Sequence, residues 1–176
     1  MIFGYLSPIS EWKQWIADGM PALDDSIPFN KHTGYNRCRI DSPNGPLSLT
    51  IPVQKYEGKS CPIGEVMMSE HGDWRHKHWH ALSSTYFNSP FFEYYQDDFR
   101  PIYLGNQKRL VDFNAQLNHL IVQLLNIKTL NLSTLNHHLS TIQYYQVFAH
   151  KHGFIADLSI IDLLFNMGPE SLLWLK

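Results

Sequence analysis

A turn-forming sequence, Ser-Pro-Asn-Gly at positions 42–45, constrains the fold more than any other feature of the chain. It interrupts the stretch NRCRIDSPNGPLSLTIPV, residues 36–53, between two runs of strand-like residues. Asn-Gly in this setting is a strong short-range signal for a β-hairpin. Four apolar residues alternate in the second run and are expected on one face: Leu47, Leu49, Ile51 and Val53. The first half of the chain is therefore predicted to contain a hairpin.

Two more apolar segments of the first half, residues 2–6 and 62–69, have the composition of strands. The rest of the pattern is mainly helical. Capping residues, glycine stops and apolar spacings of three and four predict helices over about 9–18, 73–87, 90–99 and 108–126, and shorter ones ending at Gly153 and starting at Ser159. The expected fold class is α/β, with mixed α+β as the alternative. We expect a small mixed sheet in the N-terminal half and a mostly helical C-terminal half, with the strand order left open.

Length, charge and cysteine content narrow the class of protein. A chain of 176 residues fits a single domain over residues 1–176, and 44% hydrophobic residues are sufficient for a sizeable core. A net charge of -2 gives no general attraction to nucleic acid. No apolar run approaches the roughly 20 residues of a membrane span, the N-terminus lacks the pattern of a signal peptide, and two cysteines do not make a disulfide scaffold. We therefore predict a cytoplasmic protein, and we do not predict a cofactor.

The strongest candidate for a ligand site is a polar cluster around the start of the hairpin. Its members are Lys31, Tyr35, Asn36, Arg37 and Arg39. In a strand over 35–40, Tyr35, Arg37 and Arg39 project from one face and Asn36 from the other. Two guanidinium groups on one face bind phosphate or carboxylate oxygens well, and a lysine adds a point charge. The alternative is a solvated strand face whose arginines pair with nearby acidic residues.

The turn at Ser7-Pro8 is a second, weaker candidate for anion binding. It places a helix N-terminus, with its free backbone amides, at the end of the segment 2–6. No glycine-rich phosphate loop follows it.

A histidine-rich stretch, HGDWRHKHWHAL at residues 71–82, suggests a metal site at first sight. Only His76 and His80 share a helix face at the spacing of four that two metal ligands need. Lys77 follows the first of them, and the glutamate of an H-E-x-x-H motif is absent. No metal site is therefore predicted.

Six segments together resemble the WbqC-like family of bacterial proteins, in matching order and spacing over nearly the whole chain. They are YLSPISEW (5–12), KHTGYNRCRI (31–40), NGPLSLTIPV (44–53), DWRHKHWHAL (73–82), SPFFEYYQDDF (89–99) and YYQVFAHKHGFIADLSIIDLLFNMGP (144–169). The resemblance draws attention to Trp74 and His78, one turn apart, with Tyr86 two turns further. For the namesake of the family, the resemblance implies a connection with surface-polysaccharide genes. It does not assign catalytic residues that could be transferred to positions of this chain. Ile2-Phe3-Gly4 stands where many relatives have a His-Gln-Pro-Asn-like lead.

His78 and Asp162 are the candidate catalytic residues. An imidazole with an ordinary pKa of about 6.5 suits general acid or base chemistry at neutral pH, and Asp162 is a polar residue on an otherwise apolar helix that would orient a partner. The alternatives are a core histidine bonded to a backbone carbonyl, and an aspartate that only completes the cap of its own helix.

Two functions of different classes follow. The first is an enzyme, a transferase, acting on an activated phosphate-bearing small molecule, by acyl or aminoacyl transfer in the biosynthesis of surface-polysaccharide (O-antigen) sugars. The second is a non-catalytic module that binds a ligand, or assembles with a protein partner or a second copy of itself through the aromatic segment 89–99.

Overall fold

The hairpin forms where the turn sequence predicts it. The computed structural model describes residues 4–22, 24–30, 33–58, 60–127 and 143–175. Strand β1 (Arg37–Ile40) pairs antiparallel with β2 (Leu47–Thr50), with Cys38 opposite Leu49. Gly45 closes the turn at a φ of 96°, and its N–H donates to the carbonyl of Ser42. These two strands are the only sheet in the described part of the chain.

The alternation of the first strand is also as predicted. Arg37 and Arg39 are exposed, whereas Cys38 and Ile40 between them are buried. In the second strand the prediction holds only in part: Leu49 is buried, but Leu47 at the turn end is 38% exposed. One face of the hairpin therefore contributes to the core, and the other carries the two arginines.

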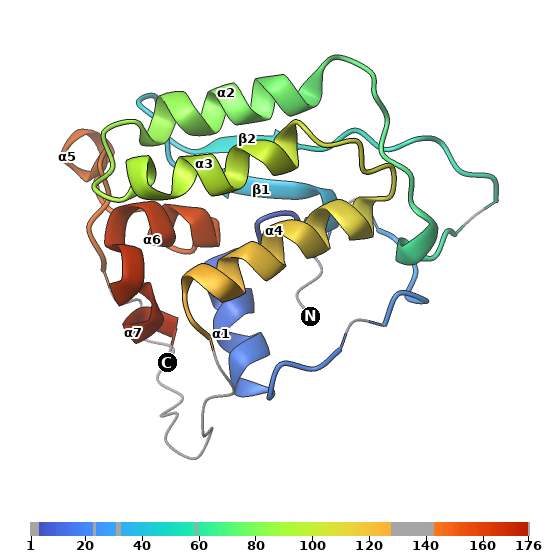
Figure 1. Cartoon of the computed structure of the whole chain (residues 1–176), viewed down its shortest axis with the longest axis horizontal. Helices are drawn as coiled ribbons and strands as arrows, with labels where there is room; N and C mark the ends of the chain where they lie inside the picture. Colours follow the sequence, from blue (N-terminus) through green and yellow to red (C-terminus); the bar gives the residue numbers. More distant parts are fainter. Residues whose placement is uncertain (1–3, 23, 31–32, 59, 128–142, 176) are drawn as a thin grey trace.

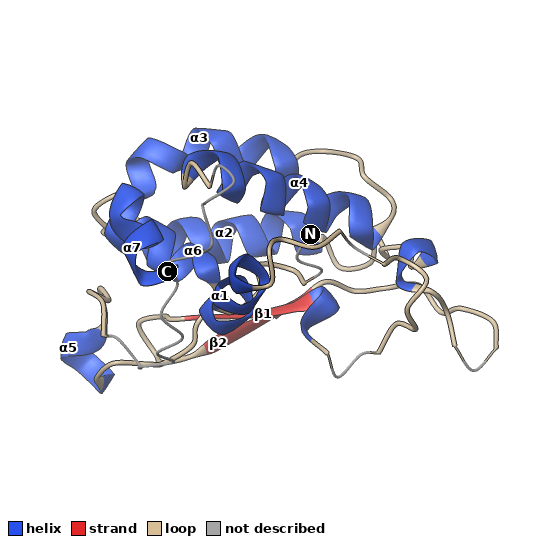
Figure 2. Cartoon of the chain, turned by 90° about the horizontal axis from the view of Figure 1, so that it is seen from below, coloured by secondary structure: helices blue, strands red, loops and turns tan. Residues whose placement is uncertain are grey.

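Helices make up most of the remaining structure. They are α1 (Ile9–Ala17), α2 (Trp74–Tyr86), α3 (Phe92–Tyr103), α4 (Leu110–Leu124), α5 (Ala149–His152), α6 (Ile160–Met167) and α7 (Ser171–Leu175). Short 3-10 helices cover Gly34–Asn36, Ile63–Glu65 and Gly168–Glu170. Helices α2, α3 and α4 lie on one side of the hairpin, and α1 lies beside β1 (Figures 1 and 2). The predicted class, with a small sheet in the N-terminal half and a mostly helical C-terminal half, is confirmed.

The strand predictions for residues 2–6 and 62–69 are wrong where the structure describes them. Leu6 has a φ of 47°, so residues 4–6 form a turn, and the N–H of Tyr5 donates to the carbonyl of Tyr35 outside any ladder. Residues 63–65 form a 3-10 helix, and isolated bridges such as Val53 with Met68 replace a strand. The apolar residues Tyr5, Leu6, Ile63, Val66 and Met68 of these segments are buried, and burial does not require a ladder of strand hydrogen bonds.

One hydrophobic cluster connects the hairpin with the long helices. On α4 it includes Leu110, Phe113, Leu117 and Ile121, the spacing of three and four that predicted this helix. Among the described helices, none has the length and apolar character needed to cross a membrane.

Candidate functional site

The two arginines of β1 lie in a cleft on the outer face of the hairpin. The cleft has a volume of about 540 Å³, and β1 shares its walls with the first turn of α1 and with the loop before α6. Glu11 and Asp157 also line it. The cleft therefore contains both signs of charge.

Among the residues that the structure describes, the guanidinium groups of Arg37 and Arg39 use few of their donors. Nε of Arg37 donates to the hydroxyl of Thr50 over 3.2 Å, and Nη2 of Arg39 donates to the carbonyl of Ala156 over 2.9 Å. Neither arginine forms an ion pair within the described residues. The alternative of a strand face neutralised by neighbouring carboxylates therefore lacks its expected ion pairs in this part of the chain.

The acidic groups of the cleft differ in their availability. The carboxylate of Asp157 accepts hydrogen bonds from the backbone N–H and the hydroxyl of Ser10, each over 2.9 Å. It therefore caps the N-terminus of α1. The expectation that free amides at this helix end bind an anion is wrong, because a carboxylate of the same chain already occupies the position.

Two of the other predicted anion ligands, Asn36 and Tyr35, do not join the two arginines. Asn36 belongs to the 3-10 helix before β1 and not to the predicted strand over 35–40. It is buried and donates from Nδ2 to the carbonyl of Ile51 over 2.8 Å, so its side chain faces inward. Tyr35 is half-buried in the 3-10 helix and lines a neighbouring pocket. Lys31 lies outside the described residues. The structure thus brings Arg37 and Arg39 together, without Asn36 or Tyr35.

His78 lies on the inner side of the hairpin, on the face of α2 that enters the core. Its Nδ1 is 3.0 Å from the hydroxyl of Tyr5, which is itself 2.9 Å from the hydroxyl of Tyr103. The imidazole is 6% exposed and stacks on Tyr5, and Trp74 meets it edge-on. Burial lowers the pKa of His78 to about 4, so the ring is neutral at neutral pH.

The histidines around His78 face solvent. His76 and His80 are exposed on α2, with ring centroids 6.4 Å apart. Within the described residues no group of three or more His, Cys, Asp or Glu side chains is placed to hold a metal ion.

Asp162 is buried on α6 between two tyrosines. Its carboxylate accepts from the hydroxyl of Tyr86 over 2.8 Å and from that of Tyr144 over 2.5 Å. Burial raises the pKa of Asp162 to about 6, although the two hydroxyl donors oppose the change. The backbone N–H of Ser159 donates to the backbone carbonyl of Arg39 over 2.8 Å, so Asp162 does not close a capping box on its own helix.

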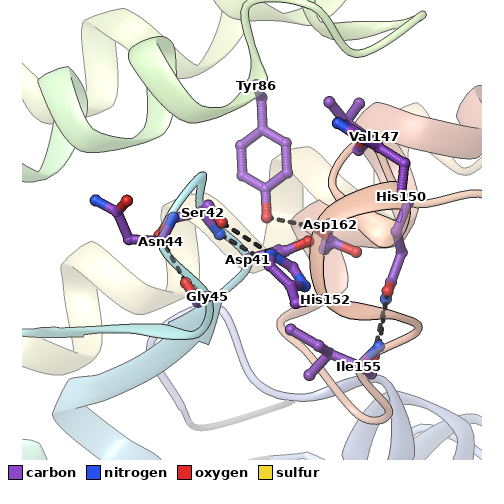
Figure 3. A network of polar contacts seen from close by, with 11 residues as sticks. Asp41, Ser42, Asn44, Gly45, Tyr86, Val147, His150, His152, Ile155 and Asp162 are labelled. Carbon is purple, nitrogen blue, oxygen red and sulfur yellow. Dashed lines mark hydrogen bonds and ion pairs between the residues drawn. The ribbon is translucent and has the colours of Figure 1, made fainter.

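The sequence interpretation missed a second buried carboxylate beside Asp162. Asp41 follows β1 and is 1% exposed; its Oδ1 is 3.2 Å from Nε2 of His152 on α5 (Figure 3). Burial raises the pKa of Asp41, against the effects of the Ser42 amide and His152, and its Oδ2 has no hydrogen-bond partner among the residues that the structure describes. The sequence signal was an aspartate between an apolar strand and a turn, which is indistinguishable from an ordinary turn residue.

The predicted catalytic residues and the arginines do not converge in one pocket. Arg37 and Arg39 are on the outer face of β1, whereas Cys38 between them is buried and belongs to the same hydrophobic cluster as Tyr5 and Tyr86. His78 contacts the first of these tyrosines and Asp162 the second. The strand therefore stands between the cleft and both candidate catalytic groups.

The sequence of this chain matches a known family over most of its length. A model of the WbqC-like protein family matches residues 5–138. The chain belongs to the WbqC-like protein family.

A relative of this WbqC-like chain is the uncharacterized protein Rv1507c of Mycobacterium tuberculosis (strain ATCC 25618 / H37Rv), 32% identical over 106 residues. The match covers 60% of this chain and 46% of the relative, so the chain spans less than half of that protein's length. No solved structure matches this chain significantly. The WbqC-like match includes Arg37, Arg39 and His78, whereas Asp157 and Asp162 lie beyond its end.

Proposed function

We propose that this protein binds a phosphate-bearing small molecule in the cleft between β1 and α1. The observation that carries the proposal is the pair of guanidinium groups, Arg37 and Arg39, that share a cleft and have no ion-pair partner in the described part of the chain. Planar guanidinium groups bind phosphate oxygens through paired hydrogen bonds. Glu11, in the same cleft, favours a ligand that also carries hydrogen-bond donors.

The geometry favours ligand binding over the predicted transfer chemistry. A general acid or base must come within hydrogen-bonding distance of the reacting group, and His78 lies in the core behind β1. Acyl or aminoacyl transfer in surface-polysaccharide sugar biosynthesis stays a prediction, as do the assignments of His78 and Asp162 to it. Assembly with a protein partner or a second copy of the chain also stays a prediction.

Thermal unfolding in the presence of inorganic phosphate and pyrophosphate tests the proposal. A ligand that binds only the folded state stabilises it by about 2.7 kcal/mol at 100 times its Kd, so Tm should rise with the logarithm of the pyrophosphate concentration once that concentration exceeds the Kd. Arg37→Ala should weaken binding at least tenfold. Arg100→Ala removes an exposed arginine on α3 that does not line the cleft, and should bind like the unmodified protein.

Two results would contradict the proposal: no change in Tm with either anion, or a change that persists in Arg37→Ala. Arg37→Lys distinguishes paired hydrogen bonding from simple charge, because lysine keeps the charge and loses the planar fork. Its affinity should fall between those of the unmodified protein and Arg37→Ala.

A further inference from the structure

A second pocket adjoins the arginine cleft and differs from it in chemistry. It has a volume of about 350 Å³ and lies along the same face of the first helix, α1, further toward the C-terminus of that helix. The second pocket and the arginine cleft share three lining residues, Glu11, Thr33 and Gly34, so the pocket and the cleft meet there. A ligand that enters both would place one end at the arginines and the other in the second pocket.

The floor of the second pocket is largely apolar and aromatic. Trp15, Tyr35 and Pro21 contribute to it. The indole Nε1 of Trp15 donates to the carbonyl of Pro21 over 3.1 Å, so its only polar atom already has a partner within the protein. What this residue offers to a ligand is its ring, and flat aromatic ligands stack on such rings.

The rim of the second pocket accepts hydrogen bonds. Nε2 of Gln14 donates to Oδ1 of Asp18 over 2.8 Å. A carboxylate oxygen accepts two hydrogen bonds, so both oxygens of Asp18 keep acceptor capacity, as does the amide oxygen of Gln14. Glu11 adds a carboxylate at the junction with the cleft. The rim therefore suits a group with several N–H donors, and it disfavours one that presents carbonyl oxygens.

We infer that the ligand is a nucleoside phosphate with a guanine-type base, its phosphate at Arg37 and Arg39 and its base on Trp15 and Tyr35. This inference rests on the proposed phosphate site and specifies the rest of the ligand. A guanine edge carries a ring N–H next to an amino group, and one carboxylate accepts both in a paired arrangement. A uracil edge carries one N–H between two carbonyl oxygens, which would face Asp18 unfavourably.

Calorimetric titration with GMP, UMP and ribose 5-phosphate tests the inference, because the three compounds share a sugar phosphate and differ in the base. GMP should bind at least tenfold more tightly than ribose 5-phosphate and about fivefold more tightly than UMP. Asp18→Asn should remove most of the preference for GMP over UMP and leave the affinity for ribose 5-phosphate unchanged. Asp97→Asn, at an exposed position on α3 away from both pockets, should keep the preference.

The outcomes separate this inference from the phosphate site. Equal binding of all three compounds, lost together in Arg37→Ala, would overturn the assignment of the base and leave the phosphate site standing. A preference for GMP that survives in Asp18→Asn would place the base elsewhere and would also overturn it. Absence of binding by all three compounds would overturn the phosphate site itself.

Discussion

The stability of the protein should depend on pH through His78. The pKa of His78 is about 4 in the folded protein, whereas the pKa of a histidine in an unfolded chain is about 6.5. Between these values the unfolded chain binds a proton that the folded protein does not, so acid favours unfolding. The contribution is fully present above pH 6.5 and is lost as the pH falls to 4. It amounts to about 3.4 kcal/mol in total, and to about 2 kcal/mol between pH 7.5 and pH 5.

Urea unfolding at a series of pH values, on the unmodified protein and on His78→Gln, measures this contribution. The variant loses the hydrogen bond to Tyr5, so it should be less stable at pH 7.5, and that deficit should shrink by about 2 kcal/mol at pH 5. His80→Gln alters an exposed histidine of the same helix and should follow the unmodified protein at every pH.

A deficit in His78→Gln that stays constant from pH 7.5 to pH 5 would refute the reasoning. It would mean that His78 binds its proton equally well in the folded and unfolded chains. The burial of the ring and its contact with Tyr5 would then not exclude the imidazolium form.

Three further results are expected. Asp162 should act in the opposite direction: because its pKa in the folded protein is raised to about 6, its contribution to the free energy of unfolding is present below about pH 3.8 and is lost as the pH rises through 6. In urea unfolding, Asp162→Asn should remove a decline in stability of about 1.4 kcal/mol between pH 5 and pH 7.5. An unchanged pH profile in this variant would count against the prediction. Gly168→Ala should lower the free energy of unfolding by about 3 kcal/mol, since φ is 57° and the added Cβ would be 2.4 Å from a ring carbon of Phe91. Gly153→Ala, with φ of 77° and open space around the added Cβ, should lower it by only about 1 kcal/mol. Equal losses in chemical denaturation would refute the steric argument. Asp157→Ala should cost about 1 kcal/mol by removing the cap of α1, and an unchanged Tm would contradict that role.

Local signals explain why the hairpin and the main helices could be predicted from the sequence. The Asn-Gly turn and the alternation of β1 depend on neighbouring residues only, and so does the apolar spacing of α4. The strand prediction for the segment 2–6 was wrong at residues 4–6, because the apolar character of Tyr5 and Leu6 reflects a long-range environment. Tyr5 is buried by contacts with residues as distant as His78 and Tyr103, and the chain turns at Leu6 to place it there.

The same distinction between local and long-range signals applies to the candidate site. The exposure of Arg37 and Arg39 on one face follows from the period of a strand, so the sequence could indicate it. The environment of Asp162 could not be predicted, because its hydroxyl donor Tyr86 is 76 residues away in the chain. The pairing of Asp41 with His152 across 111 positions is of the same kind.

The hairpin separates two uses of ionisable groups in this protein. On its inner side, burial holds His78 neutral and raises the pKa of Asp162, which favours the uncharged form of each group. On its outer side, the two arginines stay exposed and charged without partners in the described residues. An anionic ligand gains most where charges are already present and only partly solvated, and a neutral imidazole in the core gives it nothing. The binding site is therefore expected on the outer face of β1, and the buried groups are expected to affect stability rather than affinity.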